Sequence, residues 1–323
     1  IEPSKEYIDT IKKYLNLDLI KSKNLKIIID NMYGPGKGYI ENILEDTDTQ
    51  IIILHTEHNP LFGGIIPEPI SENLQETKFM VMKEKADLGV VTDGDADRFG
   101  LIDRGGKYIS HNEALALLLY HLYENKKLKG DIARSIATTH LLDRIAEYYG
   151  FKTFETPVGF KYIAEIMKNH DTILMGGEES GGFTLKEHIL EKDGILADVL
   201  LIELYSYENK KSFSEMIEEI KQKFGYLYNK RFNIYISREK KGELMQYIKE
   251  NNPSHSESKE PIKKEIINDG VRFTFPDESW TFIRPSGTED IIRLYIEAKS
   301  EEDIGSIYEY MNNFLKTFKG GVK

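Results

Sequence analysis

Continuous apolar runs alternate with predicted helices along the first two thirds of the chain. Unbroken apolar runs are typical of strands that are buried on both faces of a sheet. We expect such strands at residues 26–30, 51–54 and 87–92. We expect helices at residues 3–16, 38–45 and 71–84, the first with Ser4 as its N-cap. Strands that alternate with helices predict a mostly parallel, doubly wound sheet.

A second unit of the same kind begins near Asp131. Its expected strands are 132–138, 151–154 and 172–175, and its expected helices are 140–149, 160–169 and 195–207. The pattern changes after Tyr226. We expect strands near 231–236, 271–275, 280–283 and 291–298 in this part of the chain. They are separated by polar helices near 238–250 and 301–318 and by a charged connection at 251–265. We therefore predict an α/β fold class, with two successive doubly wound α/β/α domains at 1–129 and 130–227 and a smaller α+β C-terminal domain at 228–323.

Composition narrows the classes of function. The 323 residues carry a net charge of −11, which argues against a nucleic-acid partner because no broad basic surface is available to neutralise phosphates. The absence of cysteine excludes disulfides, thiolate nucleophiles and cysteine metal sites. No apolar run approaches the ~20 residues that span a membrane, and the N-terminus lacks the character of a secretory signal, so we expect no membrane association and a cytoplasmic location. Because the first residue is not Met, we expect a processed, trimmed or partial chain.

The stretch Thr92–Gly100 carries the strongest candidate chemistry. Asp93, Asp95 and Asp97 alternate with other residues on a short loop between two apolar runs. Three carboxylates this close together repel one another unless a cation lies between them, and hard oxygen ligands suit Mg²⁺. Ligands of doubly wound sheets gather at the carboxyl ends of the strands, where this loop falls. The sequence therefore predicts a magnesium site, and the apolar flanks make a merely solvated acidic turn the less favoured interpretation.

Two other kinds of acidic loop fit this spacing poorly. An EF-hand that starts at Asp93 needs Gly at its sixth position and Glu at its twelfth, but Arg98 and Arg104 stand there. Phosphatases of the haloacid-dehalogenase type place Thr or Val where Asp97 stands.

A glycine-rich loop in the second unit offers groups that can bind a sugar. The strand at 172–175 leads into Gly176–Gly182, in which Glu178 and Ser180 stand two residues apart. A carboxylate accepts from two hydroxyl groups, and a serine donates or accepts, so the pair can hold vicinal sugar hydroxyls. A simple turn at a strand end is the alternative.

The third candidate is the turn Arg284–Asp290. It combines a guanidinium with the hydroxyls of Ser286 and Thr288, and backbone N–H groups around Gly287 can point into one small volume. Such a set can form a phosphate cradle, in which Arg284 binds two oxygens at once. The alternative is an ordinary Pro-Ser-Gly turn between two strands.

These three motifs, roughly a hundred residues apart, resemble those of the α-D-phosphohexomutases, the phosphoglucomutase and phosphomannomutase family. The resemblance covers essentially the whole chain and matches the second, third and fourth domains of a four-domain enzyme. One departure is Asp290, which stands where Pro is common in the family. The resemblance implies Mg²⁺ ligands at Asp93, Asp95 and Asp97, sugar-binding residues at Glu178 and Ser180, and residues that bind the distal phosphate at Arg284, Ser286, Gly287 and Thr288.

The resemblance also implies two catalytic candidates. Arg98 would steady a phosphoryl oxygen beside the metal loop, and Lys161 would move the proton of the reacting hydroxyl. Lys161 ends the stretch Thr156–Lys161, which is similar to the family's other loop in this domain and includes the substrate-binding candidate Gly159. A Lys after an aromatic residue at this place resembles the glucose-specific branch.

No serine of the chain stands in the Ser-His-Asn-Pro context in which the family's first domain carries its phosphoserine. Thr56–Pro60 has Glu in place of the serine. Ser110 lacks the following Pro and is expected to cap a helix, with Glu113 completing a capping box. His140 and His188 are expected to be surface or capping residues. The resemblance thus implies that the phosphoserine domain is missing from these residues.

The function implied by the resemblance is a phosphoglucomutase reaction. A phosphoserine gives its phosphoryl group to one sugar hydroxyl, glucose 1,6-bisphosphate forms as the intermediate and activator, and the enzyme takes back the other phosphoryl group. The expected partners are a hexose phosphate and the missing phosphoserine domain, without which we expect the chain to be inactive. Four alternatives stay open: a phosphomannomutase, a phosphoglucosamine mutase, a magnesium-dependent sugar-phosphate phosphatase and a non-catalytic sugar-phosphate-binding protein.

Overall fold

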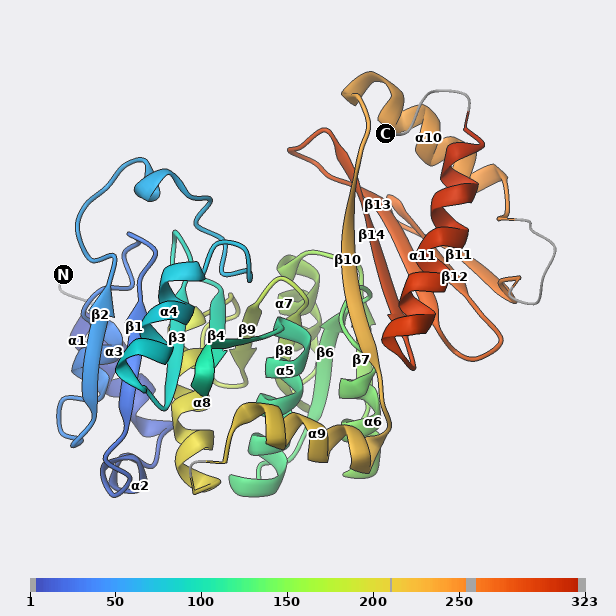
Figure 1. The fold of residues 1–323 in the computed structure, drawn as a ribbon. Helices are drawn as coiled ribbons and strands as arrows, with labels where there is room; N and C mark the ends of the chain where they lie inside the picture. The colour runs from blue at the N-terminus through green and yellow to red at the C-terminus, as the bar shows by residue number, and fades with distance from the viewer. Residues whose placement is uncertain (1–3, 210, 254–259, 319–323) are drawn as a thin grey trace. The chain divides into compact units, whose positions relative to one another are not determined.

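The computed structural model describes residues 4–209, 211–253 and 260–318 (Figure 1). The chain forms two compact units, residues 1–224 and 225–323, and each is described by itself. None of the helices in the described ranges combines the length and the apolar character that a membrane crossing requires.

The first unit contains two sheets, of which the first has the strand order β2-β1-β3-β4-β5. The three strands β2, β1 and β3 are parallel, and β4 and β5 are antiparallel to their neighbours. The strands are β1 (Lys26–Asp30), β2 (Gln50–Leu54), β3 (Leu88–Thr92), β4 (Phe99–Asp103) and β5 (Lys107–Ile109). The helices are α1 (Ser4–Lys13), α2 (Leu17–Lys21), α3 (Tyr39–Ile43) and α4 (Gln75–Glu84), with short 3₁₀ turns η1 (Phe62–Gly64) and η2 (Arg104–Gly106). Every residue of β3 and β4 is buried, as the unbroken apolar runs predict.

The second sheet has the strand order β7-β6-β8-β9, in which only the pair β8 and β9 is antiparallel. Its strands are β6 (Asp131–Ser135), β7 (Thr153–Thr156), β8 (Ile173–Glu178) and β9 (Gly182–Leu185). The helices of this part are α5 (His111–Tyr120), α6 (Leu141–Tyr148), α7 (Phe160–Asn169), α8 (Gly194–Tyr207) and α9 (Phe213–Phe224), and α5 continues into a π-helical turn, η3 (His121–Asn125).

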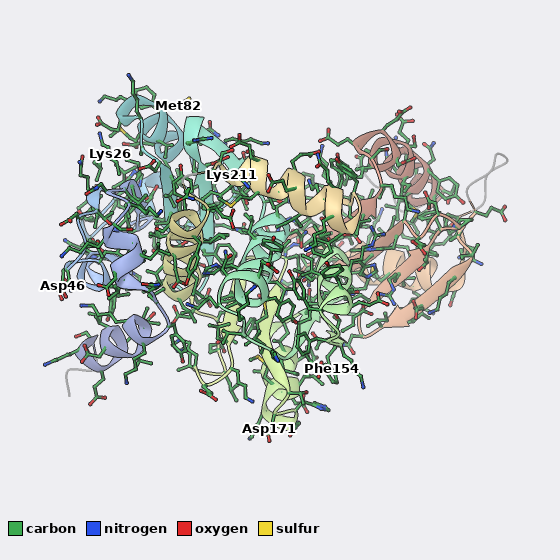
Figure 2. The ribbon with its side chains drawn as sticks, turned by 90° about the horizontal axis from the view of Figure 1, so that it is seen from below. Lys26, Asp46, Met82, Phe154, Asp171 and Lys211 are labelled. Carbon is green, nitrogen blue, oxygen red and sulfur yellow. The ribbon has the colours of Figure 1, made fainter. Side chains whose placement is uncertain are left out.

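Helix α8 packs against both sheets of the first unit. Every residue of α8 except Tyr207 is buried, and the helix contacts β3 and β4 of the first sheet and β9 of the second. A helix that is apolar all round belongs in a core. Its buried Glu203 is paired, because it accepts from His121 at 2.8 Å and from Lys126 at 2.9 Å. Side chains fill the space between these layers, whereas Met82 lies on the outer face of α4 (Figure 2).

The second unit, in its described residues, is one antiparallel sheet with two helices. The strand order is β10-β14-β13-β12-β11. The elements are β10 (Tyr228–Tyr235), α10 (Arg238–Glu250), β11 (Lys263–Ile267), β12 (Gly270–Thr274), β13 (Trp280–Pro285), β14 (Ile291–Ala298) and α11 (Glu301–Lys316). Its core joins residues of both helices, such as Leu244 and Met311, to strand residues such as Phe273 and Leu294. The fold class is therefore the one that the sequence predicts.

Several elements differ from the sequence-based prediction. The expected helix at 3–16 ends at Lys13, and the Asn16 side chain caps a separate helix, α2, by accepting from the N–H of Leu19 at 3.0 Å. Strands β5 and β9 and helix α9 were not predicted. Strand β11 begins inside the expected connection 251–265, of which residues 254–259 lie outside the described ranges.

Candidate functional site

The loop that joins β3 to β4 brings the three aspartates together. Ligand oxygens of Asp93, Asp95 and Asp97 lie within 4.8 Å of one another. Ala96 adopts a left-handed backbone with φ of 62°, which turns the loop back on itself. Oxygens on opposite sides of a Mg²⁺ ion are roughly 4 Å apart, so small side-chain rotations would let the three share one ion. An all-oxygen donor set of this kind fits Mg²⁺.

Asp93 is the buried member of the three. Its Oδ1 accepts from the backbone N–H groups of Asp97 at 2.9 Å and Arg98 at 3.1 Å, and its Oδ2 accepts from Nε of Arg98 at 2.6 Å. Burial raises the pKa of Asp93 to about 6, although the hydrogen bonds and charge of Arg98 oppose this rise. Arg98 therefore holds the carboxylate in place at the base of the loop, and its Nη1 lies 3.5 Å from Glu68.

The glycine-rich loop Gly176–Gly182, the candidate sugar loop, lies directly against the loop of the three aspartates, the candidate metal loop. Arg98 pairs with Gly182 in an isolated β-bridge, and the N–H of Phe99 donates to the carbonyl of Gly181 at 3.2 Å. A Cβ atom at Gly181 would lie 3.0 Å from the carbonyl oxygen of Phe99, and one at Gly182 would lie 2.7 Å from the side chain of Lys192. Glycine therefore permits a close approach of two motifs that the sequence predicts only separately.

Glu178 and Ser180 are already paired in this loop. Ser180 Oγ donates to Oε1 of Glu178 at 2.8 Å, and the Glu178 residue is buried. Burial raises the pKa of Glu178 to about 7, with a further contribution from the charge of Glu179. Glu179 in turn accepts from Ser135 at 2.5 Å. Glu178 thus offers an acceptor that is only partly ionised near neutral pH.

Lys192 is a site residue that sequence reasoning missed. Its Nζ lies 2.7 Å from Oδ2 of Asp97, and its stem packs on Gly182. Burial alone would lower the pKa of Lys192, but the hydrogen bond and charge of Asp97 raise the pKa above its usual value. No local motif links this residue to the metal loop, so only the folded chain reveals the contact.

A hydrogen-bonded cluster around Asp193 supports the segment that carries Lys192. The hydroxyl of Tyr7 donates to both oxygens of Asp193, at 2.9 and 2.8 Å, and the N–H of Leu196 donates to Oδ1 at 2.9 Å. Nε2 of His188 lies 2.7 Å from Oδ2. The prediction that His188 is a surface or capping residue is wrong, because its side chain is only 3% exposed against this carboxylate.

A cavity of about 370 Å³ opens beside the metal loop. It is lined by the two aspartates Asp95 and Asp97, by Lys192 and Asp193, and by the rings of Tyr7 and Tyr39, among others. The carboxylates therefore face a space that is large enough for a phosphorylated ligand.

The stretch predicted to hold Gly159 and Lys161 lies at the start of α7. Gly159 precedes the helix with φ of 123°, a backbone conformation that favours glycine. The Lys161 side chain is exposed, and its Nζ lies 4.9 Å from the ring centroid of Tyr162. The structure does not desolvate this lysine, and its proton-transfer role stays a prediction.

Ser110 has the structural role expected of it. Its Oγ accepts from the N–H of Glu113 at 3.3 Å, and Glu113 accepts from the N–H of Ser110 at 3.2 Å, which forms the capping box of α5.

The phosphate-loop candidates lie in the second unit, between β13 and β14. The N–H of Ser286 donates to the carbonyl of Ile291 at 3.0 Å, and Ser286 Oγ accepts from the N–H of Glu289 at 3.2 Å. Gly287 and Thr288 at the tip are exposed. In the described part of the chain, Nε of Arg284 has no hydrogen-bond partner, and Nη2 makes only a long 3.5 Å contact with the Tyr295 hydroxyl. The guanidinium is thus available for a ligand.

Lys241 of α10 supports this loop and was not identified from the sequence. Its Nζ donates to the carbonyl oxygens of Ser286 at 2.7 Å and Glu289 at 2.8 Å. Because these carbonyls are already engaged, the loop is held in a defined turn.

Comparisons with known proteins agree with this arrangement. Three family models match the chain: phosphoglucomutase/phosphomannomutase alpha/beta/alpha domain II over residues 5–106, alpha/beta/alpha domain III over 110–224 and the C-terminal domain over 233–313. A phosphoglucomutase/phosphomannomutase of Thermococcus kodakarensis is 32% identical over 321 residues, which are 99% of this chain and 66% of that protein. A protein of Methanosphaera stadtmanae, named probable phosphoglucosamine mutase, is 30% identical over 322 residues, which are 97% of this chain and 68% of that protein.

A solved structure gives the same result. The open form of the Paramecium phosphoglucomutase pp63/parafusin matches with a TM-score of 0.77 and 26% identity, over 92% of this chain and 58% of that one. The chain thus spans about two thirds of the length of the curated relatives it matches. With three successive domains matched in order, the chain belongs to the phosphoglucomutase/phosphomannomutase family, the α-D-phosphohexomutases.

Proposed function

We propose that these residues form the metal, sugar and distal-phosphate sites of a phosphohexomutase that interconverts glucose 1-phosphate and glucose 6-phosphate. The observation that carries this proposal is the backbone contact between the metal loop and the sugar loop, at Arg98 and Gly182. A loop suited to a divalent cation beside a loop suited to hydroxyl groups favours phosphoryl transfer to a sugar hydroxyl.

In this proposal the metal loop works on the phosphoryl group. Asp93, Asp95 and Asp97 would hold Mg²⁺, which would supply charge neutralisation for the transferring phosphoryl group. Arg98, fixed by its 2.6 Å hydrogen bond to Asp93, presents its remaining N–H groups to a phosphoryl oxygen. Lys192 adds a second cation at the boundary between the metal loop and the sugar loop.

The remaining residues orient the sugar and its second phosphate. Glu178 accepts from sugar hydroxyls while Ser180 donates or accepts, and Gly159 lets the neighbouring backbone approach the ligand. Lys161 moves the proton of the reacting hydroxyl. The loop of Arg284, Ser286, Gly287 and Thr288 binds the phosphate that is not being transferred.

The phosphoryl carrier lies outside these residues. We infer that a phosphoserine domain is the partner of this chain, and that glucose 1,6-bisphosphate is the intermediate that reorients between the two half-reactions. The three domains that we propose are 1–129, 130–227 and 228–323. We also propose a cytoplasmic location.

The test measures which hexose 1-phosphates the complete enzyme converts and which products it forms from them. Glucose 1-phosphate, mannose 1-phosphate and glucosamine 1-phosphate are each supplied with Mg²⁺ and the matching bisphosphate. The proposal predicts conversion to the 6-phosphate with no net release of inorganic phosphate, fastest for glucose. Release of inorganic phosphate would indicate a phosphatase, and binding without turnover would indicate a sugar-phosphate sensor. A preference for mannose 1-phosphate or glucosamine 1-phosphate would support the mutase reaction but show that glucose 1-phosphate is not the preferred substrate.

A further inference from the structure

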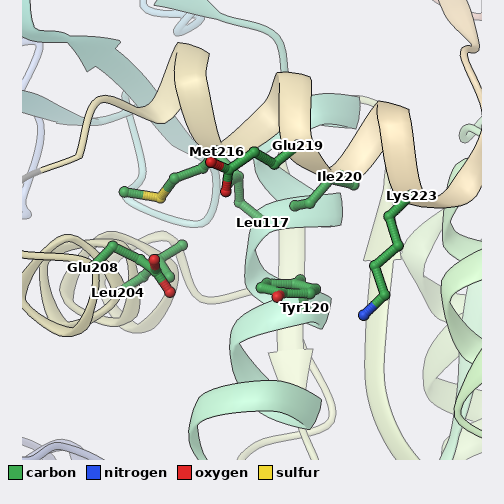
Figure 3. A pocket seen from close by; sticks show the side chains of 8 residues that line it. All are labelled: Leu117, Tyr120, Leu204, Glu208, Met216, Glu219, Ile220 and Lys223. Atoms are coloured by element: carbon green, nitrogen blue, oxygen red, sulfur yellow. The ribbon is translucent and has the colours of Figure 1, made fainter.

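A cavity of about 220 Å³ lies between α5, α8 and α9 (Figure 3). Its floor is apolar and deeply buried, because none of Leu117, Leu204, Met216 and Ile220 is more than 5% exposed. Four polar groups complete the lining: the hydroxyl of Tyr120, the carboxylates of Glu208 and Glu219, and the ammonium of Lys223. An apolar floor with a few polar groups at its edge is the usual form of a small-molecule site.

This cavity is separate from the candidate catalytic site. Helix α9 begins where the carboxylate of Asp103 accepts from the N–H groups of Phe213 at 3.0 Å and Ser214 at 2.9 Å. Asp103 ends β4, whereas Phe99 at the start of β4 follows the metal loop. Four residue steps along a strand cover ~13 Å, so α9 is anchored at the opposite end of β4 from the aspartates. None of the proposed metal, sugar or phosphate ligands lines the cavity.

One side of the cavity has an excess of negative charge. Among the described residues, Glu208 and Glu219 pair with the same cation, Lys211, whose Nζ lies 3.7 Å from Glu208 and 2.8 Å from Glu219. Two carboxylates facing one ammonium leave one negative charge without compensation. That side is suited to a cationic group.

The other side presents the ammonium of Lys223, which packs on aromatic rings and acts on the carboxylate of Glu124 through its charge. Nζ of Lys223 lies 4.4 Å from the ring centroid of Tyr148, 5.1 Å from that of Phe224, and 5.6 Å from those of Tyr120 and Tyr149. Within the described ranges, no carboxylate lies within ion-pair distance of this ammonium, even though Glu219 stands four residues earlier on the same helix. Figure 3 shows the Tyr120 ring between Glu208 on one side and Lys223 on the other.

We propose that this cavity binds a small zwitterion with an apolar side chain, such as a branched aliphatic α-amino acid. The side chain lies on the floor of Leu117, Leu204, Met216 and Ile220. The ammonium group of the amino acid pairs with the carboxylates of Glu208 and Glu219, and its carboxylate group pairs with Lys223. The volume of about 220 Å³ is below the ~300 Å³ at which sites for drug-sized ligands begin, so it suits a molecule of this size.

The first test uses three probes that share one branched aliphatic body. Leucine carries both charges, 4-methylpentanoate lacks the ammonium, and 3-methylbutylamine lacks the carboxylate. Titration calorimetry on the 323-residue chain should show leucine binding at least about tenfold more tightly than either singly charged probe, which is ~1.4 kcal/mol. No leucine binding up to its solubility limit, or equal affinity for a singly charged probe, would overturn the proposal.

The second test uses substitutions at each charged side. Lys223→Met keeps the apolar stem and should weaken leucine by at least about tenfold while leaving 3-methylbutylamine unchanged. Glu219→Gln lets Lys211 pair with Glu208, so it should weaken leucine and leave 4-methylpentanoate unchanged. The control is Lys83→Met on α4, an exposed lysine whose Nζ lies 5.9 Å from the Phe79 ring centroid and which should change nothing. Leucine affinity that is insensitive to Lys223→Met would contradict the assigned site, and circular dichroism of each variant would show that it is folded.

Discussion

At the scale of single residues, the metal loop concentrates negative charge. Asp93, Asp95 and Asp97 gather their oxygens within 4.8 Å, and the cations in contact with them are Arg98 on Asp93 and Lys192 on Asp97. Asp95 has neither of these partners, and it is the exposed member of the three. Its charge is therefore the one most directly available to a bound ion.

Asp95→Asn should weaken Mg²⁺ binding by at least about tenfold, or ~1.4 kcal/mol, because it removes one of three charges that face the ion. Titration calorimetry of Mg²⁺ into the chain and its variant measures this directly. Asp269→Asn, at an exposed turn before β12, is the matched control. Equal Mg²⁺ affinities for the chain and Asp95→Asn would show that this loop is not the metal site.

Glu178 should give stability an identifiable pH dependence. Its pKa is raised from 4.5 to about 7, so between these values the folded state holds a proton that the unfolded state has lost. The contribution of Glu178 to the free energy of unfolding is therefore fully present below about pH 4.5 and falls as pH rises to about 7. Glu178→Gln removes the titrating group and with it this fall in stability. The free energy of unfolding of the variant should therefore exceed that of the wild-type chain by roughly 2–4 kcal/mol above neutral pH and by little at low pH.

Urea unfolding across this pH range would measure the difference between the two proteins. The titration of Asp93 overlaps the same range but is present in both, so it cancels in the difference. Glu147→Gln, on the exposed face of α6, controls for the loss of a carboxylate. A pH-independent difference would show that Glu178 is not buried in the way described.

Arg284→Ala should lower kcat/KM of the complete enzyme by about 10- to 150-fold, which corresponds to a loss of ~1.5–3 kcal/mol for a charge-assisted bidentate contact. The effect should include a raised KM, because the proposed contact is made to the phosphate that is not transferred. Arg272→Ala, which breaks an ion pair with Glu265 on the same sheet, should leave kcat/KM unchanged. Unchanged kinetics of Arg284→Ala would mean that the loop is only a turn.

At the scale of elements, the side chain of Tyr7 ties the first helix to the site. Tyr7 on α1 donates to both oxygens of Asp193, which caps α8 and adjoins Lys192. Tyr7→Phe removes this donor from a buried carboxylate and should destabilise the first unit by about 1–3 kcal/mol. Tyr14→Phe is the matched control, because its hydroxyl donates to an exposed backbone carbonyl, that of Glu187, at 3.0 Å.

Hydrogen exchange can locate the effect of Tyr7→Phe. Amides of α1 and of the first turn of α8 should exchange faster, whereas the fluorescence transition of Trp280, the single tryptophan and a residue of the second unit, should not move. Exchange that rises equally in all elements would contradict a local link between α1 and α8.

Periodicity predicts most elements of this fold but not the short or polar ones. Strands β1, β3 and β8 are continuous apolar runs, which only a buried sheet explains. Strand β11, with the sequence Lys-Lys-Glu-Ile-Ile, lies at a sheet edge where charged residues are tolerated, so its composition resembles a linker. Strand β9 is four residues long and lies at the edge of its sheet beside β8, so it leaves little periodicity to detect.

At the scale of the whole molecule, the motifs are visible in the sequence but their contacts are not. The aspartates, Glu178 with Ser180, and the Arg284 loop each form a local pattern of recognisable chemistry. Lys192 and Lys241 have no such pattern, because each acts through contacts with a loop far away in the chain. Long-range contacts of this kind are set by topology, which the local sequence does not encode.

We propose that these 323 residues hold the sites for metal, sugar and distal phosphate but no phosphoryl carrier. The serine whose context is nearest to a carrier, Ser110, is engaged in the capping box of α5. The most direct measurement is a coupled assay of this chain with glucose 1-phosphate, glucose 1,6-bisphosphate and Mg²⁺, with and without an added phosphoserine domain of the family. We predict no glucose 6-phosphate above background from the chain alone and its appearance when the domain is added. Sustained turnover by the chain alone would contradict this account.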